Sequence, residues 1–300
     1  MAGMDPFEDL LRGLRADGAG FRRAELSPPW TLRPGGAAAL TLYAPLRGEG
    51  WLRQEEGGGE PLRVVPGDLA IVREPGPFVL ADRPSPGADP AEGTVLLTAA
   101  YPVRGTVARR LHGLLPPVVV APGGDGCASL LDVLEAQAGA CPPGQQVVRD
   151  RLLDWLLVCS LRGWFDRPGA APSGWFHALG DATVGPVLRA MHAAPERPWT
   201  LATLAAQARV SRTTLAERFT RLVGEPPLTY LTDWRMTLAA DLLTGSTEKV
   251  GAVARRAGYA DAFGFSAAFK RFHGVSPSAY RANCWAEEGC SAGAEVGGSR

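Results

Sequence analysis

The sequence predicts an α+β multidomain protein with an N-terminal β-barrel, a helical hairpin after it, and a C-terminal all-α domain that contains one two-helix unit twice. Three observations support this fold class. Short apolar runs interrupted by Gly and Pro fill residues 21–120, a helical period follows Gly123-Gly124, and one apolar pattern occurs twice after residue 200. With 300 residues, 46% of them hydrophobic, the chain can bury two or three separate cores.

The N-terminal part is expected to begin with a short helix over residues 5–18, followed by strands. The apolar runs predict strands at 21–26, 38–45, 49–54, 61–65, 68–73, 77–81 and 94–99. Gly and Pro clusters predict turns between them, at 34–36, 57–59, 66–68 and 75–76.

The middle of the chain carries apolar residues at spacings of three and four. These residues predict two helices within 128–165, separated by Cys141-Pro142-Pro143-Gly144. An exposed linker is expected over 166–174, and a disordered acidic and Gly/Ser-rich end over 286–300. The predicted domains are therefore 1–122, 123–182 and 183–283, with a tail at 284–300.

An internal repeat organises the C-terminal domain. Leu201, Leu204, Ala205, Ala208 and Val210 are matched 49 residues later by Val250, Val253, Ala254, Ala257 and Tyr259. After one inserted residue the offset becomes 50, and it pairs Leu215, Phe219, Leu222, Gly224, Pro227 and Tyr230 with Phe265, Phe269, Phe272, Gly274, Pro277 and Tyr280. Two copies of one structural unit explain both offsets.

Each copy is predicted to be a helix-turn-helix unit, with turns at Arg209-Val210 and at Gly258-Tyr259. Ser211 and Asp261 are placed to cap the second helix of each unit. A connecting helix that begins at Pro226-Pro227 and runs to Thr244-Gly245 would be roughly 25 Å long at 1.5 Å per residue. That length would allow the two units to face successive major grooves, which lie about 34 Å apart.

The charge is distributed unevenly along a chain whose formal net charge is +0. Residues 183–283 contain 13 Lys+Arg and 7 Asp+Glu, which gives +6, whereas residues 1–182 contain 17 and 21, which gives −4. The repeat therefore lies in a basic segment, as contact with a polyanion requires.

Residues 183–283 resemble the AraC/XylS DNA-binding domain. The resemblance is strongest over Val253-Ala-Arg-Arg-Ala-Gly-Tyr-Ala-Asp-Ala-Phe-Gly-Phe-Ser-Ala-Ala-Phe-Lys-Arg-Phe-His-Gly-Val-Ser-Pro-Ser-Ala-Tyr-Arg281. It implies that the N-terminal residues of each recognition helix contact base edges, namely Arg212, Thr213, Ala216 and Glu217 in the first unit and Ala262, Phe263, Ser266 and Ala267 in the second. Arg221, Lys270, Arg271 and Arg281 are interpreted as phosphate contacts.

The β region resembles the cupin-type sensor domain of AraC-like regulators over Leu42–Leu52 and Val65–Val79. Metal-dependent cupins place histidines near Tyr43 and Phe78, and no histidine precedes His112, so no metal or other cofactor is expected. Trp30, Tyr43, Trp51 and Phe78 could line a small-molecule pocket, but barrel core is the favoured interpretation.

The cysteines and histidines indicate no catalytic or metal site. The five cysteines form no C-x-x-C pair and no motif that lowers a thiolate pKa, and the four histidines are scattered. The N-terminus lacks an apolar targeting segment, and no stretch is apolar enough to span a membrane, so a cytoplasmic location is expected.

The sequence therefore predicts a transcription regulator, not an enzyme, that binds double-stranded promoter DNA. The resemblance implies an activator rather than a repressor, contact with RNA polymerase, and a homodimer formed through the helices within 128–165. A helical core within the monomer explains the apolar residues of these helices almost as well. A small-molecule effector bound by the β domain is the leading hypothesis. The alternatives are a β domain without ligand that serves only assembly and, with less support, a cupin-type enzyme.

Overall fold

The computed structural model describes residues 6–12, 19–33, 40–55, 59–85, 87–89, 93–102, 105–137, 143–165, 167 and 174–284. It divides into two compact units. The β unit comprises residues 14–104 and 111–172, and the helical unit comprises residues 1–13, 105–110 and 173–300. This division differs from the predicted boundaries, because the helical hairpin belongs to the β unit and a short segment at 105–110 belongs to the helical unit.

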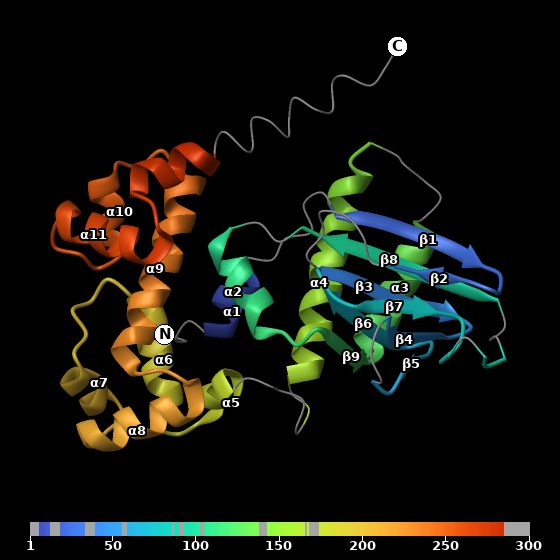
Figure 1. Ribbon diagram of the computed structural model, residues 1–300, viewed down its shortest axis with the longest axis horizontal. Helices are drawn as coiled ribbons and strands as arrows, with labels where there is room; N and C mark the ends of the chain where they lie inside the picture. Colours follow the sequence, from blue (N-terminus) through green and yellow to red (C-terminus); the bar gives the residue numbers. More distant parts are fainter. Residues whose placement is uncertain are drawn as a thin grey trace, which may run out of the picture. The chain divides into compact units, whose positions relative to one another are not determined.

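The β unit contains two antiparallel sheets, which confirms the predicted β-rich domain (Figure 1). In the described part of the chain, one sheet has the strand order β1-β8-β3-β6-β9 and the other the order β2-β7-β4-β5. The strands are β1 (Gly20–Leu26), β2 (Thr31–Leu32), β3 (Leu40–Arg47), β4 (Gly50–Gln54), β5 (Leu62–Val64), β6 (Asp68–Arg73), β7 (Phe78–Ala81), β8 (Thr94–Tyr101) and β9 (Val118–Pro122).

Seven of these strands coincide with predicted ones, and β2 and β9 were not predicted. The turns predicted at 34–36 and 57–59 lie wholly or largely outside the described residues, as do most of the linker predicted over 166–174 and the ends of the helix predicted over 5–18. Inward-facing residues of strands from both sheets, together with Trp30 just before β2, form a core that also contains Tyr43, Leu52 and Leu96. Apolar burial between two sheets is the expected source of stability for such a unit.

Helices α3 (Asp125–Ala136) and α4 (Gln145–Phe165) pack against each other, and α4 also packs on β9. They are the predicted hairpin, and the Tyr101 hydroxyl on β8 ties α4 to the sheet by donating to the Leu153 carbonyl at 3.0 Å. Among the described residues, no helix combines the length and apolar character that crossing a membrane requires.

The helical unit contains α1 (Pro6–Arg12), α5 (Gly174–Gly180), α6 (Val184–Ala193), α7 (Leu201–Gln207), α8 (Arg212–Val223), α9 (Pro227–Gly245), α10 (Val250–Arg256) and α11 (Ala262–His273). Helix α2 (Thr106–Leu114) begins in this unit. Within the unit, α7 and α8 lie toward one end of α9, and α10 and α11 lie toward the other (Figure 1). Residues 277–284 form a further helix, and the predicted tail beyond Cys284 lies outside the described residues.

Candidate nucleic-acid interface

The two helix-turn-helix units have the same backbone, as the repeat predicts. The Val210 amide donates to the Ala205 carbonyl at 3.1 Å, and the Tyr259 amide donates to the Ala254 carbonyl at 2.9 Å. These bonds close equivalent turns 49 residues apart. The residue before each turn amide has a positive φ, which is 56° at Arg209 and 77° at Gly258. Glycine adopts this conformation freely, whereas arginine adopts it at a cost in backbone energy.

The second helix of each unit begins at the predicted cap. The Ser211 hydroxyl accepts from the Thr214 amide at 3.1 Å. The Asp261 carboxylate accepts from the amides of Phe263 and Gly264 at 2.9 and 2.7 Å. These caps satisfy amides that the helices leave without intrahelical partners and fix where each recognition helix begins.

An ion pair holds the first recognition helix, α8, to the segment before α6. The Arg218 guanidinium donates to both Asp181 carboxylate oxygens at 2.7 to 3.1 Å. The same carboxylate accepts from the amides of Thr183 and Val184, each at 2.9 Å. These hydrogen bonds lower the pKa of Asp181 to about 2, and those from Arg218 have the largest effect. No sequence pattern predicts this contact, because the two residues are 37 positions apart and match no motif.

The predicted base-contacting residues of α8 lie on its outer side. Arg212, Thr213 and Glu217 are exposed, and Ala216 is half-buried beside them. Leu215 and Phe219, on the opposite side of the helix, are fully buried. The amphipathic spacing therefore places a polar surface with donors and an acceptor toward solvent.

The equivalent surface of α11 has a different chemistry. Ala262 and Ala267 are exposed, and Phe263 is 86% exposed, an unusual position for so large an apolar side chain. The half-buried Ser266 hydroxyl already donates to the Ala262 carbonyl at 2.7 Å, so it retains only its acceptor lone pairs.

The four predicted phosphate contacts fall into two groups. Arg221, Lys270 and Arg271 are exposed. Arg281 is half-buried and donates to the carbonyls of Leu243 and Glu248 at 2.8 and 2.6 Å. Its guanidinium therefore joins the helix after α11 to the end of α9, and part of its donor capacity is used within the protein.

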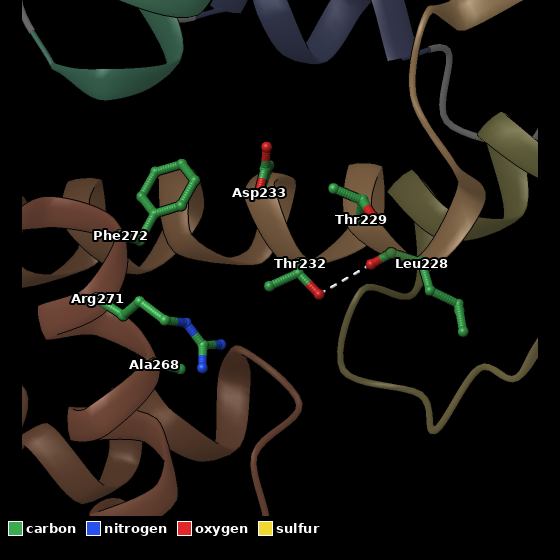
Figure 2. A pocket seen from close by; sticks show the side chains of 7 residues that line it. All are labelled: Leu228, Thr229, Thr232, Asp233, Ala268, Arg271 and Phe272. Carbon is green, nitrogen blue, oxygen red and sulfur yellow. Dashed lines mark hydrogen bonds between the residues drawn. The ribbon is translucent and has the colours of Figure 1, made fainter. Parts of the chain in front are cut away.

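A cleft of about 460 Å³ separates α9 from the end of α11. Figure 2 shows the Arg271 side chain extending between the two helices toward Thr232, whereas the Asp233 carboxylate points to the other side of α9. Leu228 and Phe272 border the cleft and are 41% and 44% exposed. The cleft thus presents one cation and two apolar side chains beside the second recognition helix.

The aromatic residues singled out in the β unit do not all lie together. Trp30 and Tyr43 are buried in the core between the sheets, and the partly buried Phe78 packs on that core. Trp51 lies outside this cluster, beneath the Arg63 guanidinium at 6.0 Å. Neighbouring residues of a strand point to opposite faces, so Leu52 enters the core and Trp51 does not.

Burial and the nearby charge of Glu74 raise the pKa of Tyr43 above its ordinary value. Glu74 is itself buried and accepts a hydrogen bond from the Thr41 hydroxyl. In the described part of the chain, no three His, Cys, Asp or Glu side chains are grouped to hold a metal ion.

These features define a protein that joins a β-sheet domain to a pair of helix-turn-helix units. Comparison with protein families agrees: residues 5–166 match the family described as cupin, and residues 204–283 match the helix-turn-helix domain.

Among curated proteins, the chain is 32% identical to a putative AraC-like transcription regulator of Streptomyces antibioticus, over 93% of this chain and 98% of that one. It is 37% identical to the regulator AlkR of Acinetobacter baylyi over 46% of this chain and 45% of that one. A similar solved structure is the DNA-binding domain of AdpA in complex with a target DNA, at 36% identity and a TM-score of 0.34, covering 36% of this chain and 96% of that one. The chain belongs to the AraC-like transcription regulators, and its helix-turn-helix domain binds DNA.

Proposed function

We propose that the helical unit binds two adjacent half-sites on DNA, with α8 in one major groove and α11 in the next. The length of α9 supports this proposal. Its 19 residues span about 28 Å at 1.5 Å per residue, which is close to the separation of successive major grooves on one face of the duplex.

The two half-sites are expected to be recognised unequally. In the first, Glu217 can accept a hydrogen bond from cytosine N4, and Arg212 can donate to guanine or to a phosphate. In the second, Ala262, Ala267 and Phe263 can make only apolar contacts, for example with thymine methyl groups. Hydrogen-bonded recognition is therefore richer at the first half-site.

Two substitutions test this assignment after bound sequences have been selected from a random DNA pool. We expect Glu217→Ala to change the base preference at the first half-site, and Lys270→Ala to weaken binding to all sequences alike. Lys270 is exposed on α11 and serves as the matched variant for a phosphate contact. An equal loss on every sequence for both variants would overturn the separation of roles.

We further propose that the protein acts as a homodimer and that α4 contributes to the interface. The proposal is supported by an exposed apolar surface on α4, where Val148 is 47% and Trp155 is 56% exposed. The two positions are two helical turns apart and lie on the same side of the helix. We expect Trp155→Glu to shift the protein toward the monomer in light scattering at equal concentration. An unchanged mass would exclude α4 as the interface.

Modulation by a small molecule, and activation through RNA polymerase, complete the proposed function. Thermal-shift screening tests the first: stabilisation by a ligand supports an effector, whereas DNA binding without stabilisation by any ligand favours a β domain that serves only assembly. A promoter fusion with and without the protein tests activation. Repression of the fusion would contradict it.

A further inference from the structure

The helical unit contains an acidic and aromatic surface that is occupied by an arginine from the segment 105–110. The Arg110 guanidinium lies over the rings of Tyr230 and Trp234, with 4.9 and 6.0 Å between its central carbon and the ring centres. Its Nη2 is 3.8 Å from the Glu225 carboxylate. These contacts lie near the beginning of α9, next to the first helix-turn-helix unit.

The surface is suited to a guanidinium. Burial raises the pKa of both Glu225 and Asp233, and the positive charge of Arg110 opposes this rise at each carboxyl group. A planar cation can stack on aromatic rings and face carboxylates at once, which an ammonium group does less well. We call Glu225, Tyr230, Asp233 and Trp234 the arginine socket.

The segment has a second attachment, near the end of α9. The Asp241 carboxylate accepts hydrogen bonds from the amides of Thr106 and Val107, the latter at 3.1 Å, and so caps helix α2. Gly105 precedes the cap with a φ of +79°, and a side chain there would meet the Asp241 carboxylate at 3.1 Å. The local sequence is therefore matched to this docking position in both conformation and space.

The segment also contacts the helix that follows α11. The Tyr280 hydroxyl accepts from Arg109 Nη2 at 3.1 Å and lies 3.4 Å from the Thr106 hydroxyl. Tyr280 in turn packs edge-on against Phe269, in the core of the second helix-turn-helix unit. Residues 105–110 thus contact elements adjoining both helix-turn-helix units, although they lie more than 90 positions before either one in the chain.

We propose that residues 105–110 act as a clamp that fixes the separation of the two helix-turn-helix units. The effect on DNA rests on the two half-sites proposed above. The remaining residues of α2 belong to the β unit, where the His112 ring is 3.1 Å from the Glu74 carbonyl.

The test compares Arg110→Gln with the wild-type protein on two DNA fragments, measured by fluorescence anisotropy. One fragment carries the selected half-sites, and in the other the half-sites are about two base pairs further apart, which rotates them by about 70° relative to each other. Arg110→Lys keeps the charge but loses the planar stacking. Arg22→Gln, at an exposed position on β1, is the matched control.

We expect the wild-type protein and Arg22→Gln to bind the fragment with the selected spacing much more tightly than the other fragment. Arg110→Gln should reduce the ratio of the two affinities about fivefold, an effect within the range of one desolvated cation–π contact. The ratio for Arg110→Lys should lie between those of the wild-type protein and Arg110→Gln. Hydrogen exchange provides a second readout, because release of the segment should expose the amides of Thr106 and Val107. Asp241→Ala, which removes the cap without touching the socket, should change both measurements in the same direction and is informative if Arg110→Gln fails to fold.

The clamp is overturned if Arg110→Gln and Asp241→Ala speed exchange at Thr106 and Val107 while discrimination stays at the wild-type level. It is also overturned if neither substitution changes exchange, since the segment is then not held by these contacts. If the wild-type protein binds both DNA fragments with equal affinity, the two-half-site proposal is overturned instead. Hydrogen exchange at Thr106 and Val107 in the two variants would still decide whether these contacts hold the segment.

Discussion

We expect the ion pair between Asp181 and Arg218 to contribute to the stability of the helical unit. The pKa of Asp181 falls from its ordinary 3.8 to about 2, chiefly because Arg218 donates to the carboxylate. A tenfold change in a proton equilibrium corresponds to about 1.4 kcal/mol, so this difference sets an upper limit of about 2.5 kcal/mol. The Arg218 side chain is 41% exposed, and because solvent screens the pair we expect about 1 kcal/mol.

Asp181→Asn should therefore lower the free energy of unfolding by about this amount at neutral pH. The amide oxygen of the new residue can still accept from a backbone amide, so the loss reports mainly on Arg218. Urea unfolding followed by far-ultraviolet circular dichroism measures it. Glu55→Gln, which breaks an exposed ion pair with Arg33 on the β unit, is the control and should cost less than about 0.5 kcal/mol.

The pH dependence gives the sharper test. A carboxyl group whose folded pKa is depressed contributes stability that is fully present above its unfolded pKa and disappears as the pH falls through the folded value. The difference between wild-type protein and Asp181→Asn should be constant above about pH 5 and should shrink between pH 3.8 and about 2. An equal difference at pH 7 and pH 3, or none at either, would refute the assignment.

The remaining predictions concern the turns, the recognition helices, a thiol and the phosphate contacts. Arg209→Gly should stabilise the protein by about 0.5 to 1 kcal/mol, since glycine adopts the positive φ at this position without strain. Gly258→Ala should destabilise it, because the new Cβ would lie 3.0 Å from the Glu196 Cα. Urea unfolding measures both changes. Phe265→Ala should cost about 3 to 5 kcal/mol because the ring is fully buried, and Phe263→Ala, at an exposed position, should instead alter DNA binding with little change in stability. Burial raises the pKa of the Cys127 thiol, and Cys159 nearby adds to the effect. In the native protein, iodoacetamide should therefore label Cys127 more slowly than it labels a model thiol. After unfolding, the two labelling rates should be similar. Lys270→Gln should reduce the slope of log affinity against log salt by about 0.9, whereas Arg281→Gln should lower stability and reduce the slope by less, because Arg281 donates to backbone carbonyls.

The helix-turn-helix repeat was predictable because its determinants are local. Cap residues, turn glycines and apolar spacing act within about ten residues of each other, and the structure confirms Ser211 and Asp261 as caps. Seven strands were predictable for the same reason. Strand β2 has only two residues, too few for an alternating pattern, and β9 is a run of valines whose pairing with β6 depends on distant sequence.

Helix α2 and its contacts were not predicted, although a signal was present. Val107, Ala108, Leu111 and Leu115 are buried at helical spacing, but Pro and Gly residues on both sides made the segment resemble its strand-forming neighbours. The function of Arg110 could not be predicted in this way. Its partners begin 115 residues later, and only the folded unit brings Glu225 and Trp234 to it.

The same distinction between local and long-range determinants applies to the positive charge of the DNA-binding unit. By count, residues 183–283 carry a net charge of +6, yet several arginines are committed to the fold. Arg218 pairs with Asp181, and Arg235, like Arg281, donates to backbone carbonyls. The cations left on the outer surface of the recognition helices include Arg212, Arg221 and Lys270. Because each phosphate contact adds about 0.9 to the salt dependence, affinity for DNA should follow this exposed set, and substitutions among the internal arginines should act through stability instead.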